Sequence, residues 1–328
     1  MSEPTRATRE DVEQASAQAE VIRAEIAKAV VGQIDIVEQV LVGLFAGGHA
    51  LIEGVPGLGK TLLVKALSRT FNGSFARIQF TPDLMPADIT GHAMFEQQSG
   101  QFRIRRGPVF TNLLLADEIN RAPAKTQAAL LEVMQERQVT IEGKALELSP
   151  PFMTLATQNP IESEGTYPLP EAQLDRFLVK LLIEYPTGSD ENTLVKAVTS
   201  GQVGDTLNVS SVSQVIDPAG IQRIQAIVST LMVDERVNDY AVAIVRKTRE
   251  WPGVAVGAGP RGGIALIRAA RAQALLAGRE FVTPDDVKRV ARPCLRHRLT
   301  LSPELEIEGH STDEILGAIL GGVDAPRT

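Results

Sequence analysis

The stretch Gly54-Val-Pro-Gly-Leu-Gly-Lys-Thr61 decides the fold, because it has the spacing G-x-x-x-x-G-K-[ST] of a phosphate-binding loop. Glycines let successive backbone N–H groups point into one concavity, and the N-terminus of a following helix adds partial positive charge. A short apolar run at 49–53 precedes the loop and helix formers at 61–71 follow it. The sequence therefore predicts a strand, a nucleotide-binding loop and a helix. The expected nucleotide-binding residues of this stretch are Gly54, Val55, Pro56, Gly57, Leu58, Gly59, Lys60, Thr61 and Leu62.

Two side chains of the loop have separate expected roles. We expect Lys60 to reach the β- and γ-phosphates of the nucleotide and Thr61 to place its hydroxyl on Mg²⁺. A chance glycine turn before a helix is the alternative interpretation, but the strand and the helix on either side favour nucleotide binding.

A second apolar strand, Leu113-Leu-Leu-Ala-Asp-Glu118, ends in two carboxylates. Because ligands of open α/β folds bind at the carboxyl edge of the sheet, Asp117 and Glu118 are candidates for the same site. Asp117 would hold Mg²⁺ through water, and Glu118 would orient and polarise the attacking water. Taken alone, the pair could equally be a strand that runs into an acidic helix start.

A third apolar strand, at 152–157, is followed by amides, and Asn159 is a candidate for sensing the γ-phosphate. The sequence Asn159-Pro160 could instead simply open a turn. Arg176 and Arg261 are single arginines at the edges of predicted elements, where the usual role is a surface ion pair. Spacing alone does not decide their role.

Alternating strands and helices up to residue 185 predict an α/β fold with a parallel sheet between helices, and amphipathic helices alone follow. We expect a flexible arm at 1–11, the α/β domain at 12–185 and an all-helical lid domain at 186–328. Two segments interrupt the alternation as predicted β-hairpins, at 94–104 and 139–148, and a turn-rich insertion lies at 81–91.

Composition restricts the classes of protein further. The chain has 328 residues, enough for two domains, with 33 Lys plus Arg against 40 Asp plus Glu and a formal charge of −7. Such a charge gives no overall attraction to nucleic acid or to an anionic membrane. The N-terminus carries no signal-peptide pattern, and the longest apolar run, at 40–48, is too short to span a bilayer, so we expect a soluble, cytoplasmic protein.

These motifs, in this order, resemble those of AAA+ ATPases, and their amino-acid sequences are most similar to those of the MoxR family. The most specific signature is Thr157-Gln-Asn-Pro-Ile161 followed by Gly165-Thr-Tyr-Pro-Leu-Pro-Glu-Ala-Gln-Leu-Asp-Arg-Phe177, with Asp117-Glu-Ile-Asn-Arg121 upstream. The resemblance extends from Val31 almost to the end of the chain. It implies an AAA+ P-loop NTPase core with β-hairpin insertions and a helical lid.

The resemblance also implies roles for residues that spacing could not assign. By similarity Asn159 is the first sensor, Arg176 the arginine finger offered to a neighbouring subunit, and Arg261 the second sensor on the lid, reaching the γ-phosphate. Gly32 and Gln33 match the family's segment beside the adenine base. The implied activity is ATP hydrolysis with Mg²⁺ in a homo-oligomeric ring, usually a hexamer. The implied role is chaperone-like maturation of a protein client, often with a von Willebrand factor A domain protein.

Two other classes stay open on the sequence alone. One is a nucleic-acid or transcription-regulating motor, since residues 246–298 hold 12 basic against 4 acidic residues. A solvated or phosphate-facing lid surface explains that excess better, and the chain has no recognisable helix-turn-helix or zinc ligands, so we do not expect nucleic acid as a partner. The other is a nucleotide-sensing scaffold that binds ATP and hydrolyses it negligibly. The intact set of Lys60, Thr61, Asp117 and Glu118 weighs against it, because a pure switch could lose Glu118 without penalty.

Overall fold

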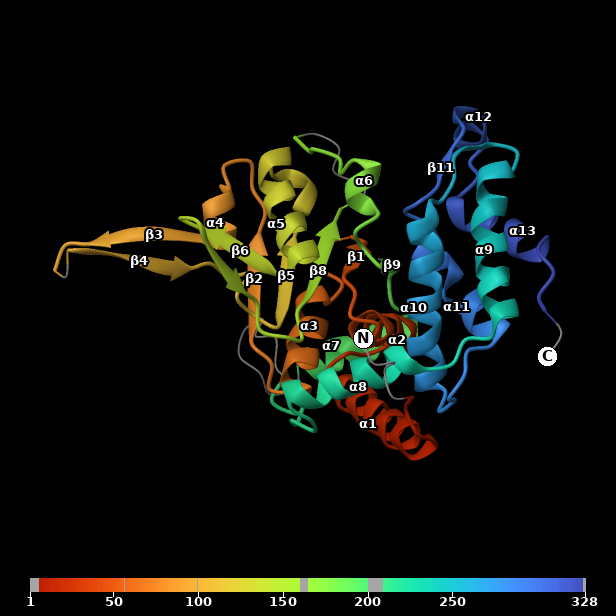
Figure 1. Cartoon of the computed structure of the whole chain (residues 1–328), viewed down its shortest axis with the longest axis horizontal. Helices are drawn as coiled ribbons and strands as arrows, with labels where there is room; N and C mark the ends of the chain where they lie inside the picture. Colours follow the sequence, from red (N-terminus) through yellow and green to blue (C-terminus); the bar gives the residue numbers. More distant parts are fainter. Residues whose placement is uncertain (1–5, 56, 99, 160–164, 200–208, 327–328) are drawn as a thin grey trace.

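A five-stranded parallel sheet forms the centre of the computed structural model, which describes residues 6–55, 57–98, 100–159, 165–199 and 209–326 (Figure 1). The strand order is β2-β5-β8-β1-β9. The strands are β1 (Ala50–Glu53), β2 (Phe75–Gln79), β5 (Leu113–Asp117), β8 (Met153–Gln158) and β9 (Val179–Leu182). The predicted α/β class is confirmed, and the carboxyl ends of β5, β8 and β1 lie next to one another.

Alternate residues of each central strand enter two different hydrophobic cores, because successive side chains of a strand point to opposite faces. In β5, Leu113 and Leu115 pack in one core, whereas Leu114 and Ala116 pack in the other. Both faces of the sheet are therefore covered, which is why almost every residue of the central strands β5 and β8 is buried.

The helices of the α/β part cover both faces of the sheet. They are α1 (Arg9–Ala27), α2 (Ile34–Phe45), α3 (Lys60–Thr70), α5 (Ala124–Glu136) and two short helices, α4 (Pro86–Thr90) and α6 (Glu171–Leu174), with a 3₁₀ turn at Ile119–Arg121. Helix α1 begins before the predicted position because Thr8 and Asp11 form a capping box at its N-terminus. Residues 9–11, which the sequence analysis assigned to the arm, are therefore helical.

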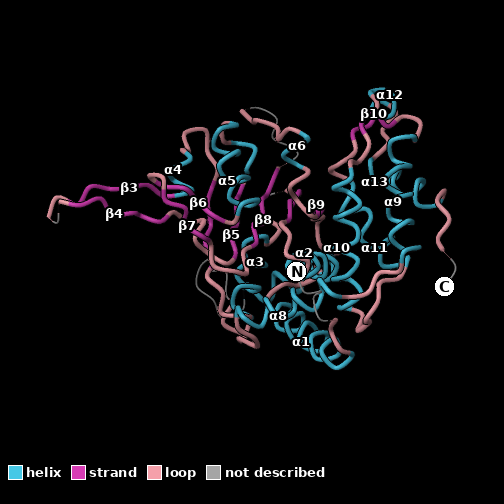
Figure 2. Tube along the Cα trace, viewed as in Figure 1, coloured by secondary structure: helices cyan, strands magenta, loops and turns pink. Residues whose placement is uncertain are grey.

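Both hairpins expected from the sequence are present. Strands β3 (Gly91–Glu96) and β4 (Gln101–Arg106) pair antiparallel, as do β6 (Gln138–Ile141) and β7 (Lys144–Glu147). The β3–β4 hairpin projects far from the body of the molecule (Figures 1 and 2). Near its end Phe95 and Phe102 face each other, with ring centroids 5.3 Å apart, and Phe102 is 73% exposed.

The C-terminal part is almost entirely helical (Figure 2). Its elements are α7 (Gly188–Thr199), α8 (Pro218–Thr230), α9 (Glu235–Glu250), α10 (Pro260–Leu276), α11 (Pro284–Leu295), α12 (Pro303–Ile307) and α13 (Thr312–Gly321), with a small sheet of β10 (Val254–Val256) and β11 (Thr300–Leu301). Helices α8, α9, α10, α11 and α13 share one hydrophobic core with α1 and α2, and α9 to α13 lie together beside the sheet (Figure 1). The predicted boundary near residue 185 stays a prediction.

None of the helices in the described ranges combines the length and the apolar character that crossing a bilayer requires. The expected cytoplasmic location stays a prediction.

Two buried histidines join the sheet to its surroundings. The Nδ1 atom of His49 accepts a hydrogen bond from the backbone N–H of Thr154 at 2.9 Å, and its Nε2 atom lies 3.0 Å from the carbonyl oxygen of Met134. A neutral ring protonated at Nε2 satisfies both contacts. Burial lowers the pKa of His49 to about 4, and burial also lowers the pKa of His297, which contacts the Phe177 carbonyl.

These histidines predict a loss of stability in mild acid. Between the folded and unfolded pKa values of His49 the folded chain binds fewer protons than the unfolded chain. The contribution of neutral His49 to the free energy of unfolding is therefore complete above the unfolded pKa of 6.5 and falls as the pH drops toward 4. Each histidine loses at most about 1.4 kcal/mol per pH unit in this window. Urea unfolding at pH 7.5 and pH 5.0 measures the loss. His49→Gln should reduce it by about 2 kcal/mol; an unchanged loss would show that His49 does not carry the effect.

Candidate nucleotide-binding site

The phosphate loop connects β1 to α3 at the carboxyl edge of the sheet. Gly57 and Gly59 both adopt positive φ angles, of 86° and 76°, that side chains of L-residues rarely adopt. A Cβ atom at either position would meet no other atom within 4 Å, so the loop encloses open space. Backbone N–H groups at the start of α3 border this space, which is the arrangement that binds phosphate oxygens.

Lys60, the first residue of α3, lies across the loop. Its Nζ atom donates a hydrogen bond to the Gly54 carbonyl oxygen at 2.6 Å. Burial lowers the pKa of Lys60, while the carboxylates of Asp117, Glu118 and Glu53 act in the opposite direction. An ammonium that has lost part of its hydration gains from an anionic ligand, and the loop provides the place for one.

The two carboxylates predicted from the second apolar strand reach the same place. A pocket of about 260 Å³ is lined by Lys60, Thr61, Asp117, Glu118 and the end of β8. Thr157 connects β5 to β8, because its hydroxyl donates to Asp117 at 3.1 Å and accepts from the Glu118 N–H at 2.9 Å. Glu118 has a φ of 54°, a left-handed conformation that turns the chain sharply at the end of β5.

Two residues of β2 belong to the site, and the sequence analysis did not find them. Arg77 forms an ion pair with Asp117, with 2.6 Å between Nε and Oδ2, and Gln79 donates to the Glu118 carboxylate at 2.7 Å. Their alternate spacing places both side chains on one face of β2. Only the pairing of β2 with β5 makes them neighbours of the carboxylates, and the sequence does not state which strands are paired.

The same pocket contains most of the residues predicted from the loop and from the third strand. Asn159 is buried and lines it, together with Gly54, Gly57, Leu58, Gly59 and Leu62. Val55 is described but is not part of the lining, and Pro56 lies outside the described residues.

Gly32 and Gln33 lie beside the loop rather than in the pocket. The Gln33 side chain donates to the Leu58 carbonyl oxygen at 2.9 Å, and a Cβ atom on Gly32 would come within 2.7 Å of Asp190 at the start of α7. The start of α7 therefore also flanks the phosphate loop. Contact of Gly32 and Gln33 with adenine stays a prediction.

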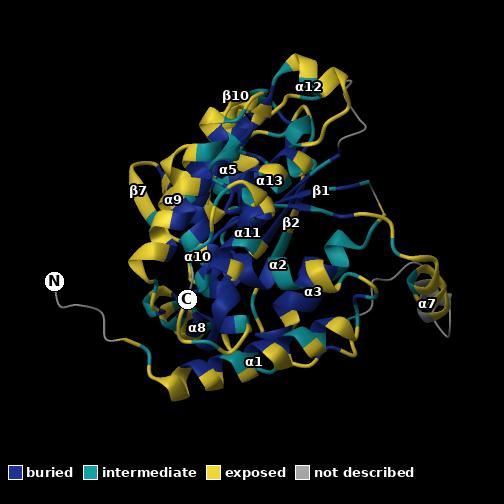
Figure 3. Cartoon of the chain, turned by 90° about the vertical axis from the view of Figure 1, so that its right-hand side faces the viewer, coloured by how far each residue is buried: buried dark blue, intermediate teal, exposed yellow. Residues whose placement is uncertain are grey.

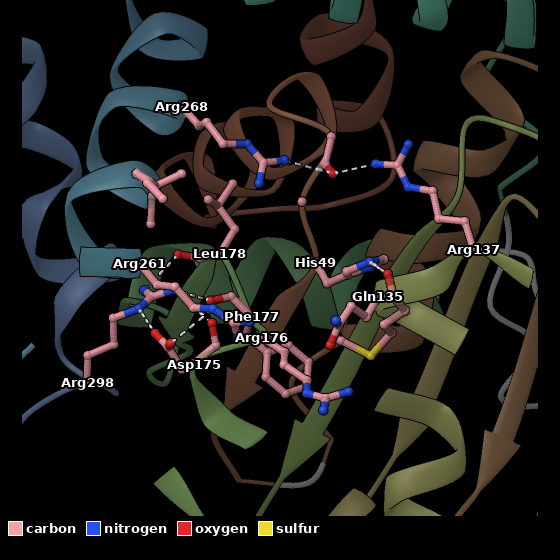
Figure 4. A pocket seen from close by; sticks show the side chains of 15 residues that line it. His49, Gln135, Arg137, Asp175, Arg176, Phe177, Leu178, Arg261, Arg268 and Arg298 are labelled. Atoms are coloured by element: carbon pink, nitrogen blue, oxygen red, sulfur yellow. Dashed lines mark hydrogen bonds and ion pairs between the residues drawn. The ribbon is translucent and has the colours of Figure 1, made fainter. Parts of the chain in front are cut away.

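Arg176 and Arg261 lie in a different pocket, of about 330 Å³, whose lining shares no residue with that of the loop (Figure 4). Arg176 donates to the Leu131 carbonyl oxygen at 2.8 Å. Asp175 lies 2.7 Å from Arg298 and 3.8 Å from Arg261. The structure thus brings the two predicted arginines together and places both away from Lys60 of the same chain.

The residues present fit Mg²⁺ only if the nucleotide supplies ligands. No group of three or more acidic, histidine or cysteine side chains that could hold a metal occurs in the described parts of the chain. Mg²⁺ in nucleotide sites is usually held by one or two protein groups together with phosphate oxygens and water. Thr61 and Asp117, which line one pocket, are a donor set of this kind.

Fold and site together define an AAA+ ATPase. Residues 49–179 match the ATPase family associated with various cellular activities (AAA), and residues 246–319 match the AAA lid domain. A solved structure from Cytophaga hutchinsonii, assigned as an ATPase, superimposes with a TM-score of 0.89 at 41% identity over 97% of this chain and 98% of that one.

Three curated relatives narrow the class. Chaperone MoxR1 of Mycobacterium tuberculosis is 44% identical over 92% of this chain and 81% of its own length. The uncharacterized protein YeaC of Bacillus subtilis is 44% identical over 92% of both chains. Protein MoxR of Methylorubrum extorquens is 33% identical over 92% of this chain and 93% of its own. The chain belongs to the MoxR family of AAA+ ATPases, as its motifs predicted.

The contacts of Lys60 predict that Lys60→Ala binds nucleotide poorly without unfolding, since the side chain donates its hydrogen bond to a loop carbonyl oxygen. We expect a fluorescent ATP analogue to bind about a hundredfold more weakly, because a charge-assisted contact to phosphate is lost. Lys65→Ala, on the same helix, is the matched control and should bind like the wild type. If Lys60→Ala and Lys65→Ala bound the ATP analogue with equal affinity, Lys60 would not be a nucleotide-binding residue.

Proposed function

We propose that this protein hydrolyses ATP with Mg²⁺ as a ring of identical subunits and uses the hydrolysis to remodel or mature partner proteins. The main observation in support is that one pocket is lined by Lys60, Thr61, Asp117, Glu118 and Asn159. A separate pocket is lined by Arg176 and Arg261. Family membership supports ATP as the nucleotide.

Each side chain of the first pocket has a task in this proposal. Lys60 binds the β- and γ-phosphates, and Thr61 and Asp117 hold Mg²⁺, which when bound neutralises phosphate charge. Glu118 accepts a proton from the attacking water, and Gln79 keeps its carboxylate oriented through the 2.7 Å hydrogen bond. Asn159 contacts the water or the γ-phosphate at the end of β8.

A single chain supplies an incomplete site in this proposal. Arg176 and Arg261 are placed together in a pocket that borders neither Lys60 nor Glu118. We infer that both arginines act on the nucleotide of a neighbouring subunit, the finger and the sensor entering from the same side. An arginine supplied in trans raises phosphoryl-transfer rates about 10³- to 10⁵-fold, so that hydrolysis depends on assembly. A hexamer is the ring size that the family resemblance suggests.

The projecting β3–β4 hairpin supports a protein client. Met94, Phe95 and Phe102 are large apolar side chains, about half exposed or more, on an element that reaches away from the body (Figure 1). Exposed apolar side chains gathered in one place mark sites that contact other proteins. A von Willebrand factor A domain protein is one candidate partner.

The role of Glu118 predicts a variant that binds ATP without turning it over. Glu118→Gln keeps the shape of the side chain but cannot accept the proton, so we expect hydrolysis to fall about 10²- to 10⁴-fold with little change in ATP affinity. Phosphate release measures the rate, and Glu136→Gln, at an exposed position at the end of α5, is the control. Wild-type turnover in Glu118→Gln would show that Glu118 does not accept the proton of the attacking water.

The same variant identifies the class of partner, because it should hold the ATP-bound assembly. Affinity capture with Glu118→Gln and ATP should retain a protein, and the Phe95→Ser/Phe102→Ser version should retain less of it. Recovery of nucleic acid instead would favour the alternative, a nucleic-acid motor, for which the excess of basic residues at 246–298 is the specific observation.

The proposed action in trans predicts rescue on mixing. Arg176→Ala chains bind ATP but lack the finger, whereas Lys60→Ala chains keep the finger. In an equal mixture about a quarter of the sites join an intact loop to an intact finger, so activity should exceed the sum of the separate variants. Hydrolysis measured across a concentration series tests this. A mixture that never exceeds that sum would mean that Arg176 acts within its own chain.

A further inference from the structure

Helices α9 and α10 of the lid enclose a groove of about 600 Å³ that the proposed catalysis does not use. Its floor is apolar and includes Val242 and Ile264, which are 51% and 59% exposed. Four arginines line the groove: Arg246, Arg249, Arg268 and Arg271. An apolar floor with a cationic border suits a ligand that combines apolar and acidic groups.

The positive charge of this groove is not balanced within the chain. No carboxylate lines the groove, and in the described ranges none of its four arginines forms an ion pair. Arg249 and Arg268 donate to the carbonyl oxygens of Ala258 and Ala46, and the Nε atom of Arg271 is buried without a hydrogen-bond partner in the structure. Carboxylates from another molecule would give these guanidinium groups the partners that they lack.

The groove continues into the pocket of the two trans-acting arginines. Ile264 and Arg268 line both cavities, and Arg261 lies one turn before Ile264 and two turns before Arg268 on α10. Arg268 reaches the Gly47 carbonyl oxygen from one side while Arg137 reaches it from the other (Figure 4). A neighbouring subunit that brings its nucleotide to Arg176 and Arg261 therefore also presents its adjacent surface to the groove.

The surface beside the nucleotide pocket has the complementary chemistry. Residues 184–195, which we call the acidic arm, contain Glu184, Asp190 and Glu191 and no basic residue. Tyr185 and Val195 in the arm are 74% and 55% exposed. Helix α7, which forms most of the arm, stands away from the rest of the molecule (Figure 3). Asp190 approaches Gly32 next to the phosphate loop, so the arm flanks the nucleotide site.

We propose that the acidic arm of a second copy of this chain docks in the α9–α10 groove, with its exposed apolar side chains on the floor and its carboxylates on the arginines. This inference rests on the proposed action in trans. Arm and groove are different surfaces of one chain, so the contact is heterologous and repeats from subunit to subunit until a ring closes.

Charge reversal on each surface tests the docking. The groove variant is Arg246→Glu/Arg271→Glu, and the arm variant is Glu184→Arg/Glu191→Arg. Each variant alone opposes like charges across every interface, so we expect the dissociation constant of the ATP-bound assembly to rise at least about tenfold in sedimentation velocity. An equal mixture should assemble within about threefold of the wild type, because alternating copies pair reversed groove with reversed arm and native groove with native arm.

A matched control carries the same change of charge elsewhere. Arg223→Glu/Arg236→Glu reverses two exposed arginines, on α8 and α9, that do not line the groove, and should assemble like the wild type. Rescue in the mixture also shows that neither variant is misfolded. If the wild type assembles and the groove variant assembles equally well, or if mixing does not rescue, the docking is wrong and the proposed function stands. A wild-type chain that stays monomeric with ATP would overturn the proposed ring and the docking with it.

Discussion

Parallel pairing of β5, β8 and β1 is the constraint on which the rest of the molecule depends. Parallel strands deliver their carboxyl ends to one edge, so three separate apolar runs end within reach of one another. The hydroxyl of Thr157 makes this register specific, since it contacts both Asp117 and Glu118 on the neighbouring strand. A slip of one residue would turn each polar end into the opposite hydrophobic core.

Local chemistry explains how much could be predicted from the sequence. The phosphate loop, its strand and its helix are contiguous, so spacing alone pointed to Lys60 and Thr61, and apolar runs that end in polar residues pointed to Asp117, Glu118 and Asn159. All five line one pocket, and their roles stay predictions. Helices with strong caps, such as α11 with Thr283 and Asp286, were also predictable. In each case the signal lies within a few residues of the feature.

What the sequence did not show depends on long-range pairing. Arg77 and Gln79 enter the site only because β2 is the edge strand next to β5, an order that no local pattern encodes. The separation of Arg261 from Lys60 depends on where the lid packs, which is decided by side chains far apart in the sequence. The net charge of −7 also gave no indication of the groove, because a sum over the whole chain does not show that four arginines without ion pairs in the described ranges lie together.

Asp175 joins the α/β part and the helical part of the molecule through one side chain. Its carboxylate contacts Arg298 and Arg261 of the helical part, and the next residue in the chain is Arg176. A rotation of the lid bundle would therefore act on the peptide that carries Arg176. The orientation of the lid and the position of Arg176 are thus coupled within one subunit through the ion pairs of Asp175.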